Sequence, residues 1–160
     1  MTERTLIVYS TKVGATEKTA NQIADVLRDK FGLEVDLVNL VKQSAPCLDP
    51  YGNIVVGTGI QQGEIYEETK IFLAKDLKGK KLAYFTCSGF IYPKTYEGTT
   101  TRYITEVLCN YQEFKPIATE SFGGYLKILG LPVSRKMDPA KVEAWAEELG
   151  KKFTEQTNEG

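Results

Sequence analysis

Hydroxyl side chains gather in one short segment of the sequence, Ser10-Thr11-Lys12-Val13-Gly14-Ala15-Thr16. Ser10, Thr11 and Thr16 can each donate a hydroxyl hydrogen bond, and Gly14 lets another group approach the backbone closely. If a helix begins here, its first amides point outward and its dipole adds partial positive charge. These features together predict an anion-binding site.

The hydrophobic period changes across this segment. Leu6 to Tyr9 is an apolar run that predicts a buried strand. From Thr16 onward apolar residues recur at helical spacing, namely Ala20, Ile23, Ala24, Leu27 and Phe31. The segment therefore connects the carboxyl end of a strand to the amino end of a helix, as the anion site requires.

The same stretch resembles the FMN phosphate-binding signature of flavodoxins, in the run Ile7-Val8-Tyr9-x-Thr11-x-x-Gly14-x-Thr16-x-x-x-Ala20-x-x-Ile23. The resemblance implies FMN as the cofactor and residues 10 to 16 as its phosphate site. It also implies an α/β, flavodoxin-like three-layer sandwich, with a five-stranded parallel sheet in the order 2-1-3-4-5 and helices on both faces. A hydroxyl-rich turn that binds no ligand is the alternative.

Other phosphate sites on related folds fit the sequence less well. A dinucleotide-binding turn needs three glycines, and only Gly14 is present. A Walker loop is absent. A receiver domain needs an aspartate at the end of strand three, where Thr58 stands, and a cysteine phosphatase loop starting at Cys87 needs an arginine at the position of Pro93. None of these comparisons argues against FMN as the ligand.

Alternating strands and helices are expected along the whole chain, 1–160, as a single domain. Further strands are predicted at 33–40, 53–58, 81–87 and 116–122, and helices at 64–77, 103–111 and from Pro139 onward. Five strands that alternate with helices favour a parallel sheet covered on both faces. Residues Thr154 to Gly160 are expected to be frayed.

Three loops should converge at the carboxyl ends of the strands: Ser10 to Thr16, Thr58 to Tyr66, and Thr86 to Tyr96. In the second loop the expected flavin contacts are Thr58, Gly59, Ile60 and Gln61. Gly59 is the first candidate, and Gly63 the second, to turn a carbonyl toward the flavin N5 atom. The alternative is that these glycines serve the loop geometry alone.

The third loop combines small residues with aromatic ones. Its expected cofactor contacts are Thr86, Cys87, Ser88, Gly89 and Tyr92. Phe90 or Tyr96 are further candidates to stack on the flavin, and the alternative places Phe90 in the core and the tyrosines at the surface. Cys87 is expected to be a buried small hydrophobe, and Trp145 a core residue.

Composition excludes several functions. The chain has 160 residues, a net charge of −1, three cysteines and no histidine. Near-neutral charge argues against nucleic-acid binding, and the lack of a long apolar run or signal peptide predicts a cytoplasmic protein without an integral membrane segment. The cysteines are odd in number and widely spaced, and histidine is absent. We therefore expect no catalytic side chains and no metal ligands. Oligomeric state is not indicated.

Two functions with FMN follow from the resemblance. The first is electron transfer between redox partner proteins, although electron-shuttle flavodoxins are commonly more acidic than this chain. The second is a quinone-linked oxidoreductase, because YSTKVGAT, VVGTGIQQGEIY and Gly123-Gly124 look like the corresponding stretches of protoporphyrinogen oxidases in the flavodoxin superfamily, and Lys12 fits that branch. Those oxidases carry a long insertion after Gly124, where this chain has only Tyr125 to Asp138 before its last helix. A flavodoxin-fold module without flavin is a third possibility.

Overall fold

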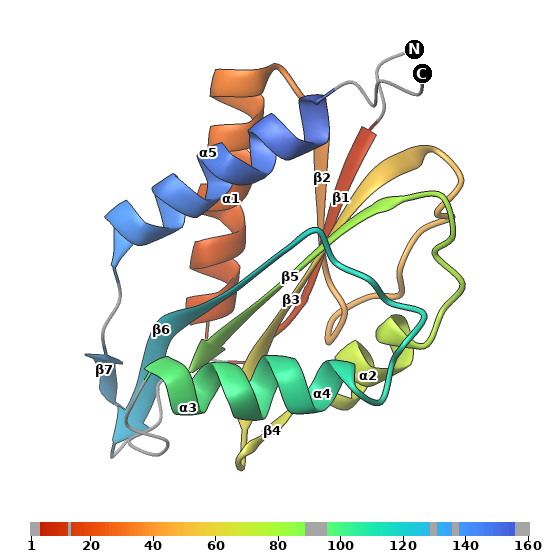
Figure 1. Ribbon diagram of the computed structural model, residues 1–160. Coiled ribbons are helices and arrows are strands. Elements are labelled where there is room, and N and C mark those ends of the chain that lie inside the picture. The colour runs from red at the N-terminus through yellow and green to blue at the C-terminus, as the bar shows by residue number, and fades with distance from the viewer. Residues whose placement is uncertain (1–3, 13, 89–95, 129–130, 136–137, 156–160) are drawn as a thin grey trace.

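The computed structural model describes residues 4–12, 14–88, 96–128, 131–135 and 138–155, with the backbone alone for 124–128 and 131–135. One twisted sheet forms its centre (Figure 1). The strands are β1 Arg4–Ser10, β2 Val35–Asn39, β3 Tyr51–Gln61, β4 Glu64–Ile65, β5 Lys81–Ser88, β6 Ala118–Ile128 and β7 Leu131–Arg135. The helices are α1 Ala15–Phe31, α2 Glu67–Leu73, α3 Tyr96–Thr100, the π-helical turn η1 Thr101–Thr105, α4 Glu106–Leu108 and α5 Pro139–Thr154.

The strand order is β2-β1-β3-β5-β6-β7, with β4 paired to β3. The first five strands of this order are parallel to one another, which confirms the predicted 2-1-3-4-5 arrangement. The two strands that were not predicted, β4 and β7, are both antiparallel partners in hairpins. Helices cover both faces of the sheet, α1 and α5 on one and α2 with the segment 96–108 on the other (Figure 1).

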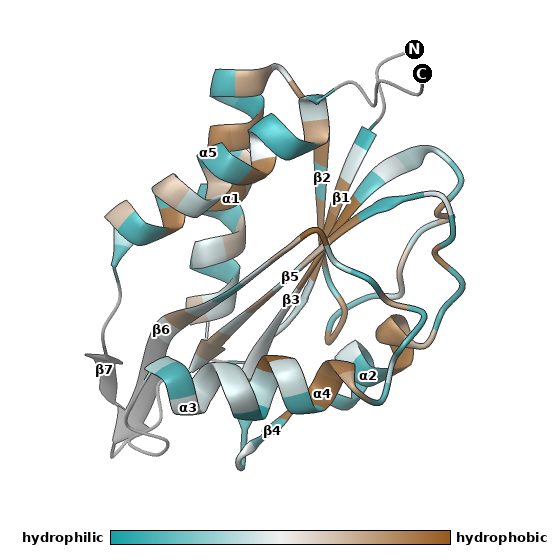
Figure 2. Ribbon diagram, in the orientation of Figure 1, coloured by the Kyte–Doolittle hydropathy of each residue, from teal (hydrophilic) through white to brown (hydrophobic). Residues whose placement is uncertain are grey.

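The apolar stripe of α1 packs on the first face of the sheet. Ile23 and Leu27 are fully buried there, as the helical spacing predicts. Trp145 of α5 joins the same core, with its ring centroid 6.0 Å from that of Phe85 and 5.7 Å from that of Phe122. Figure 2 shows apolar residues recurring among hydrophilic ones along α1 and α5. This packing fixes the angle at which α1 meets β1.

The helix on the second face starts earlier than the predicted range 103–111. It begins at Tyr96, and η1 lies in its middle. The threonine-rich start has no apolar period, so the helix there depends on tertiary packing. Tyr103 is buried, and its carbonyl accepts a 2.9 Å hydrogen bond from the Tyr84 hydroxyl.

The segment 58–66 was expected to be a loop and is a hairpin instead. Strand β3 continues to Gln61, and Ile60 pairs with Ile65 of β4. The turn consists of Gln62 and Gly63, whose φ angles of 52° and 78° suit a type I′ turn. Because β4 takes residues 64–65, α2 begins later than the predicted helix 64–77, and it also ends earlier, at Leu73.

The strand predicted at 116–122 differs in extent from its expected range, whereas the last helix begins where it was predicted. Strand β6 runs past Phe122 to Ile128 before β7 returns. Helix α5 begins at Pro139, where the Asp138 carboxylate accepts a hydrogen bond from the Lys141 amide, and it ends at Thr154. Residues 156–160 lie outside the described part of the chain.

Candidate functional site

The junction between β1 and α1 has the geometry that its sequence predicts. Ser10 is the last residue of β1, and Gly14 caps α1 with a φ of 96°. A Cβ atom at Gly14 would meet no other atom within 4 Å, so the space beside this residue is open. The amides of the first turn that follows have no intrahelical acceptor. Val13 lies outside the described residues.

Two hydroxyls of this loop accept hydrogen bonds from the protein. The Ser10 hydroxyl is fully buried and accepts from Thr69 of α2 at 2.9 Å. The Thr11 hydroxyl accepts from the Gly14 amide at 3.2 Å. A hydroxyl that accepts still carries its own hydrogen. The loop is thus held in shape by bonds that leave Ser10 able to donate to an anion.

Thr16 points toward the sheet. Its side chain is buried, and its hydroxyl oxygen lies 3.1 Å from the position that a Cβ on Gly59 would take. Thr16 and Thr19 also hydrogen-bond to the Cys87 sulfur, which lowers the thiol pKa, but burial is the larger effect and raises the pKa of Cys87 to about 11. Cys87 is therefore a neutral, buried thiol, as expected, and not a nucleophile.

Tyr66, which directly follows the β3–β4 hairpin, contacts the β1–α1 loop. Its hydroxyl accepts a 3.1 Å hydrogen bond from the Lys12 amide, and the residue is 5 % exposed. The Tyr66 amide in turn donates to the Thr58 hydroxyl at 3.4 Å. Tyr66 was the expected end of the second loop but was not among the predicted cofactor contacts. A tyrosine close in sequence to two glycines was the signal that could have indicated it.

The predicted contacts of the second loop lie in a paired strand. Gly59 pairs with Cys87 of β5, and its carbonyl accepts a hydrogen bond from the Thr58 hydroxyl at 2.8 Å. Ile60 and Gln61 pair with β4. The positive φ that eases a peptide turn is found at Gly63, whereas Gly59 is an ordinary strand residue in close contact with Thr16. Gly63 is consequently the better of the two candidates for a movable carbonyl.

The third loop is described only at its ends. Thr86, Cys87 and Ser88 complete β5, and the Thr86 hydroxyl lies 3.1 Å from that of Ser121. The predicted contacts Gly89 and Tyr92, and the candidate Phe90, lie outside the described residues.

Tyr96 is at the surface, which is the alternative that the sequence left open. It is 56 % exposed, its hydroxyl donates to Glu120, and the Lys141 ammonium lies 4.2 Å from its ring centroid. The hydrogen bond to Glu120 raises the pKa of Tyr96 above its ordinary value, and burial adds to this. One face of the ring is therefore already occupied by a cation.

Asn39 is a loop contact that sequence reasoning missed. It ends β2, and its side-chain amide donates to the Thr11 carbonyl at 3.4 Å. Its amide oxygen accepts from the Val41 amide. The carboxyl ends of neighbouring parallel strands meet at one edge, so its place at the end of β2 was an available signal.

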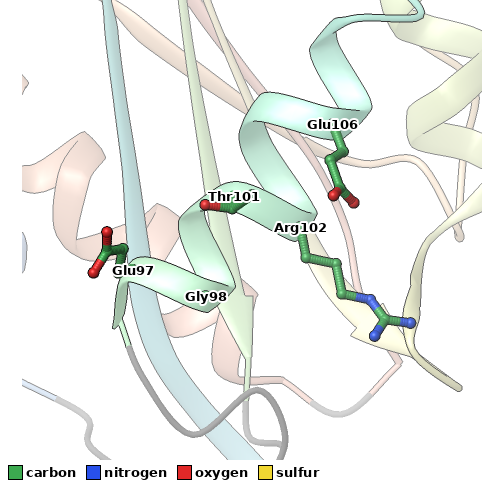
Figure 3. A pocket seen from close by; sticks show the side chains of 5 residues that line it. All are labelled: Glu97, Gly98, Thr101, Arg102 and Glu106. Atoms are coloured by element: carbon green, nitrogen blue, oxygen red, sulfur yellow. The ribbon is translucent and has the colours of Figure 1, made fainter.

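An open hollow of about 580 Å³ lies on the outer side of the helical segment 96–108. It is lined by Glu97, Gly98, Thr101, Arg102 and Glu106 (Figure 3). The Arg102 guanidinium extends from it and donates to the Gly63 carbonyl at 3.3 Å. The hollow therefore borders the turn of the β3–β4 hairpin.

The described residues hold no group of three or more potential metal ligands, and none of their helices has the length and apolar character to cross a bilayer. What the β1–α1 loop does offer is a set of hydroxyls, helix-start amides and the Lys12 ammonium. Such donors suit a phosphate group. The residues present therefore fit the phosphate end of FMN.

Comparison with known proteins points the same way. A family model described as a flavodoxin domain matches residues 6–138. Protoporphyrinogen IX dehydrogenase (quinone) of Escherichia coli (strain K12) is 29 % identical over 72 residues, which are 45 % of this chain and 39 % of that protein. The match thus spans well under half of this curated relative.

Solved structures show the same fold at low identity. Oxidised Flavodoxin 1 from Bacillus cereus has a TM-score of 0.64 and 20 % identity, over 94 % of this chain and 96 % of the other. Rubredoxin oxygen:oxidoreductase from Desulfovibrio gigas has a TM-score of 0.66 and 16 % identity, over 95 % of this chain and 36 % of the other.

Proposed function

The chain belongs to the flavodoxin domain family, which indicates FMN as its cofactor, and on this premise we propose that it transfers electrons between redox partner proteins. The observation that carries the proposal is the β1–α1 loop, where Gly14 opens a space beside the first amides of α1. Ser10 and Thr16 stand on either side of it in the sequence. This arrangement supports the binding of a phosphate without an arginine.

We assign the cofactor contacts to the ends of three strands. The proposed phosphate contacts are Ser10, Thr11, Lys12, Val13, Gly14, Ala15 and Thr16. The proposed ring contacts are Thr58, Gly59, Ile60, Gln61, Thr86, Cys87, Ser88, Gly89 and Tyr92. When bound, FMN supplies the electron-transfer chemistry that side chains lack. The chain's own residues bind the phosphate, orient the ring and keep water from the buried strand ends.

The ionisable groups next to the loop support electron transfer more than acid–base catalysis. Burial raises the pKa of both Tyr66 and Cys87, so each stays protonated at neutral pH. The Glu17 carboxylate accepts a 2.9 Å hydrogen bond from the Tyr9 hydroxyl. Neither the Tyr66 phenol nor the Cys87 thiol is therefore poised near neutral pH to exchange a proton with a substrate.

A second function, a quinone-linked FMN oxidoreductase, is favoured by the match to protoporphyrinogen IX dehydrogenase (quinone). Lys12 in the phosphate loop fits this alternative. Where that branch has a long insertion, this chain continues β6 and returns in β7, with Gly124 paired to Arg135. A porphyrin substrate therefore has less support than a quinone.

One set of measurements tests both functions. The purified protein is mixed with FMN, its visible spectrum is recorded, and the bound flavin is titrated with a reductant. Reduction in two separate one-electron steps, with negligible quinone turnover, is the result expected of an electron-transfer protein. Direct two-electron reduction with rapid quinone turnover would favour the oxidoreductase, and failure to bind FMN would overturn both.

A further inference from the structure

A buried phenol reaches the phosphate loop from outside it. The hydroxyl of Tyr66 accepts the Lys12 amide hydrogen across 54 positions of the chain, at 3.1 Å. Only 5 % of the Tyr66 surface is exposed, and its ring lies 3.4 Å from the position that a Cβ on Gly59 would take. The loop after β1 and the hairpin after β3 therefore meet at this side chain.

The Tyr66 phenol accepts a hydrogen bond but donates none to the described residues. A tyrosine hydroxyl can accept and donate at the same time. The oxygen of Tyr66 accepts from Lys12, but the described part of the chain contains no acceptor for the phenol hydrogen. Burial raises the pKa of Tyr66, against the opposing effect of the Lys12 amide, so the hydrogen is retained at neutral pH. A buried donor of this kind favours an acceptor from a ligand.

The backbone around Tyr66 keeps the phenol in place. The Tyr66 carbonyl accepts from the amides of Thr69 and Lys70 at 3.1 and 3.2 Å, which fixes the residue at the start of α2. Three positions later, the Thr69 hydroxyl donates to Ser10. The first turn of α2 thus contacts the phosphate loop through two hydroxyls, one from each of two residues on the same side of the helix.

We propose that Tyr66 completes the phosphate site, donating its phenol hydrogen to a phosphate oxygen of FMN while its oxygen holds the Lys12 amide. This inference rests on the proposed function, since it assigns a further contact within the same site. The contact involves only the phosphate end of the cofactor. Tyr66 therefore contributes to the preference for FMN over riboflavin, which has the same ring and no phosphate.

The test is Tyr66→Phe, which keeps the ring and removes the hydroxyl. The affinity of the apoprotein for FMN and for riboflavin is measured by quenching of flavin fluorescence. A hydrogen bond to a charged group stabilises by about 1.5–3 kcal/mol, so we expect roughly a tenfold or greater loss of FMN affinity. Riboflavin affinity should stay within about twofold of the wild-type value.

Tyr51→Phe is the matched control. Tyr51 is also a buried tyrosine, but it is the first residue of β3, and its hydroxyl donates to Asp36 at 2.6 Å. Its removal should leave the ratio of the two affinities unchanged. A loss of stability alone would weaken both flavins to the same degree, so the ratio separates a phosphate contact from a merely structural role.

The wild-type protein provides a second measurement if Tyr66→Phe does not fold. The phenol hydrogen of Tyr66 should give a slowly exchanging NMR signal with FMN bound and none with riboflavin bound. Equal losses for both flavins, no loss for either, or the same NMR spectrum in both complexes would overturn the inference while FMN binding stands. A wild-type protein that binds no FMN would overturn the proposed function and this inference together.

Discussion

The Thr69 hydroxyl of α2 donates a 2.9 Å hydrogen bond to the Ser10 hydroxyl at the end of β1, across 59 positions of the chain. Both side chains are fully buried. Buried hydroxyls that cannot reach water need hydrogen-bond partners inside the protein. This bond therefore helps to fix the position of α2 relative to the loop. The predictions below concern this loop and the strand ends that support it.

Replacing Thr16 by valine should weaken FMN binding about tenfold and riboflavin binding much less. The substitution keeps the volume of a fully buried side chain and removes one hydroxyl from the start of α1. Thr19→Val is the control, because Thr19 shares the Cys87 hydrogen bond and is also buried. Isothermal titration of both variants with both flavins checks the difference. Equal effects in the two variants would remove Thr16 from the phosphate site.

Replacing Lys12 by methionine should reduce FMN affinity by a few-fold and make it less dependent on salt. Lys12 is exposed, so its attraction to a phosphate is screened by ions. FMN dissociation constants are measured between low and high ionic strength. Lys78→Met is the control, because Lys78 is an exposed lysine in the turn before β5. An unchanged salt dependence in Lys12→Met would show that the ammonium does not face the cofactor.

The buried Cys87 thiol should make the protein less stable in alkali. Its pKa is about 11 in the folded state, against 9.0 as the ordinary value. Between these values the unfolded chain loses the proton and the folded chain keeps it, so this contribution is complete below pH 9 and is lost as the pH rises through 11. It amounts to about 3 kcal/mol.

Cys87→Ala should remove that part of the pH dependence, although the cavity it leaves lowers stability at every pH. Urea unfolding of both proteins at several pH values between 8 and 11.5 checks this, and the comparison cancels the tyrosines that titrate in the same range. Parallel curves for the two proteins would contradict the assigned pKa. Cys47 and Cys109 are exposed and remain in both proteins.

Replacing Gly57 by alanine should destabilise the fold by about 1–3 kcal/mol. A Cβ at this position would lie 2.2 Å from the Phe85 ring, closer than packed atoms approach. Phe85→Leu removes the ring atoms that a Cβ at Gly57 would meet, so the double variant should lose less stability than the sum of the two single ones. Thermal unfolding of the four proteins gives this coupling. Strict additivity would mean that the ring moves aside at no cost.

Residues 6 to 31 could be interpreted without any structure, because their information is local. A run of apolar residues becomes a helical stripe within a few positions, and Gly14 stands at the change, so the strand, the turn and the helix were all predictable. The strand order followed from the family resemblance. The helix that begins at Tyr96 did not, since its first turn has no apolar period and depends on packing around Tyr103.

By itself the sequence determined that β1 and α1 meet in a hydroxyl-rich turn suited to an anion, because hydrophobic period and turn chemistry act between neighbouring residues. Only the tertiary structure decided that Tyr66 and Thr69 complete this turn. Their contacts depend on the pairing of Ser10 with Thr58 and on the hairpin that carries α2 back over the loop. Such contacts arise from strand register and turn geometry over more than fifty positions, and no local pattern encodes them.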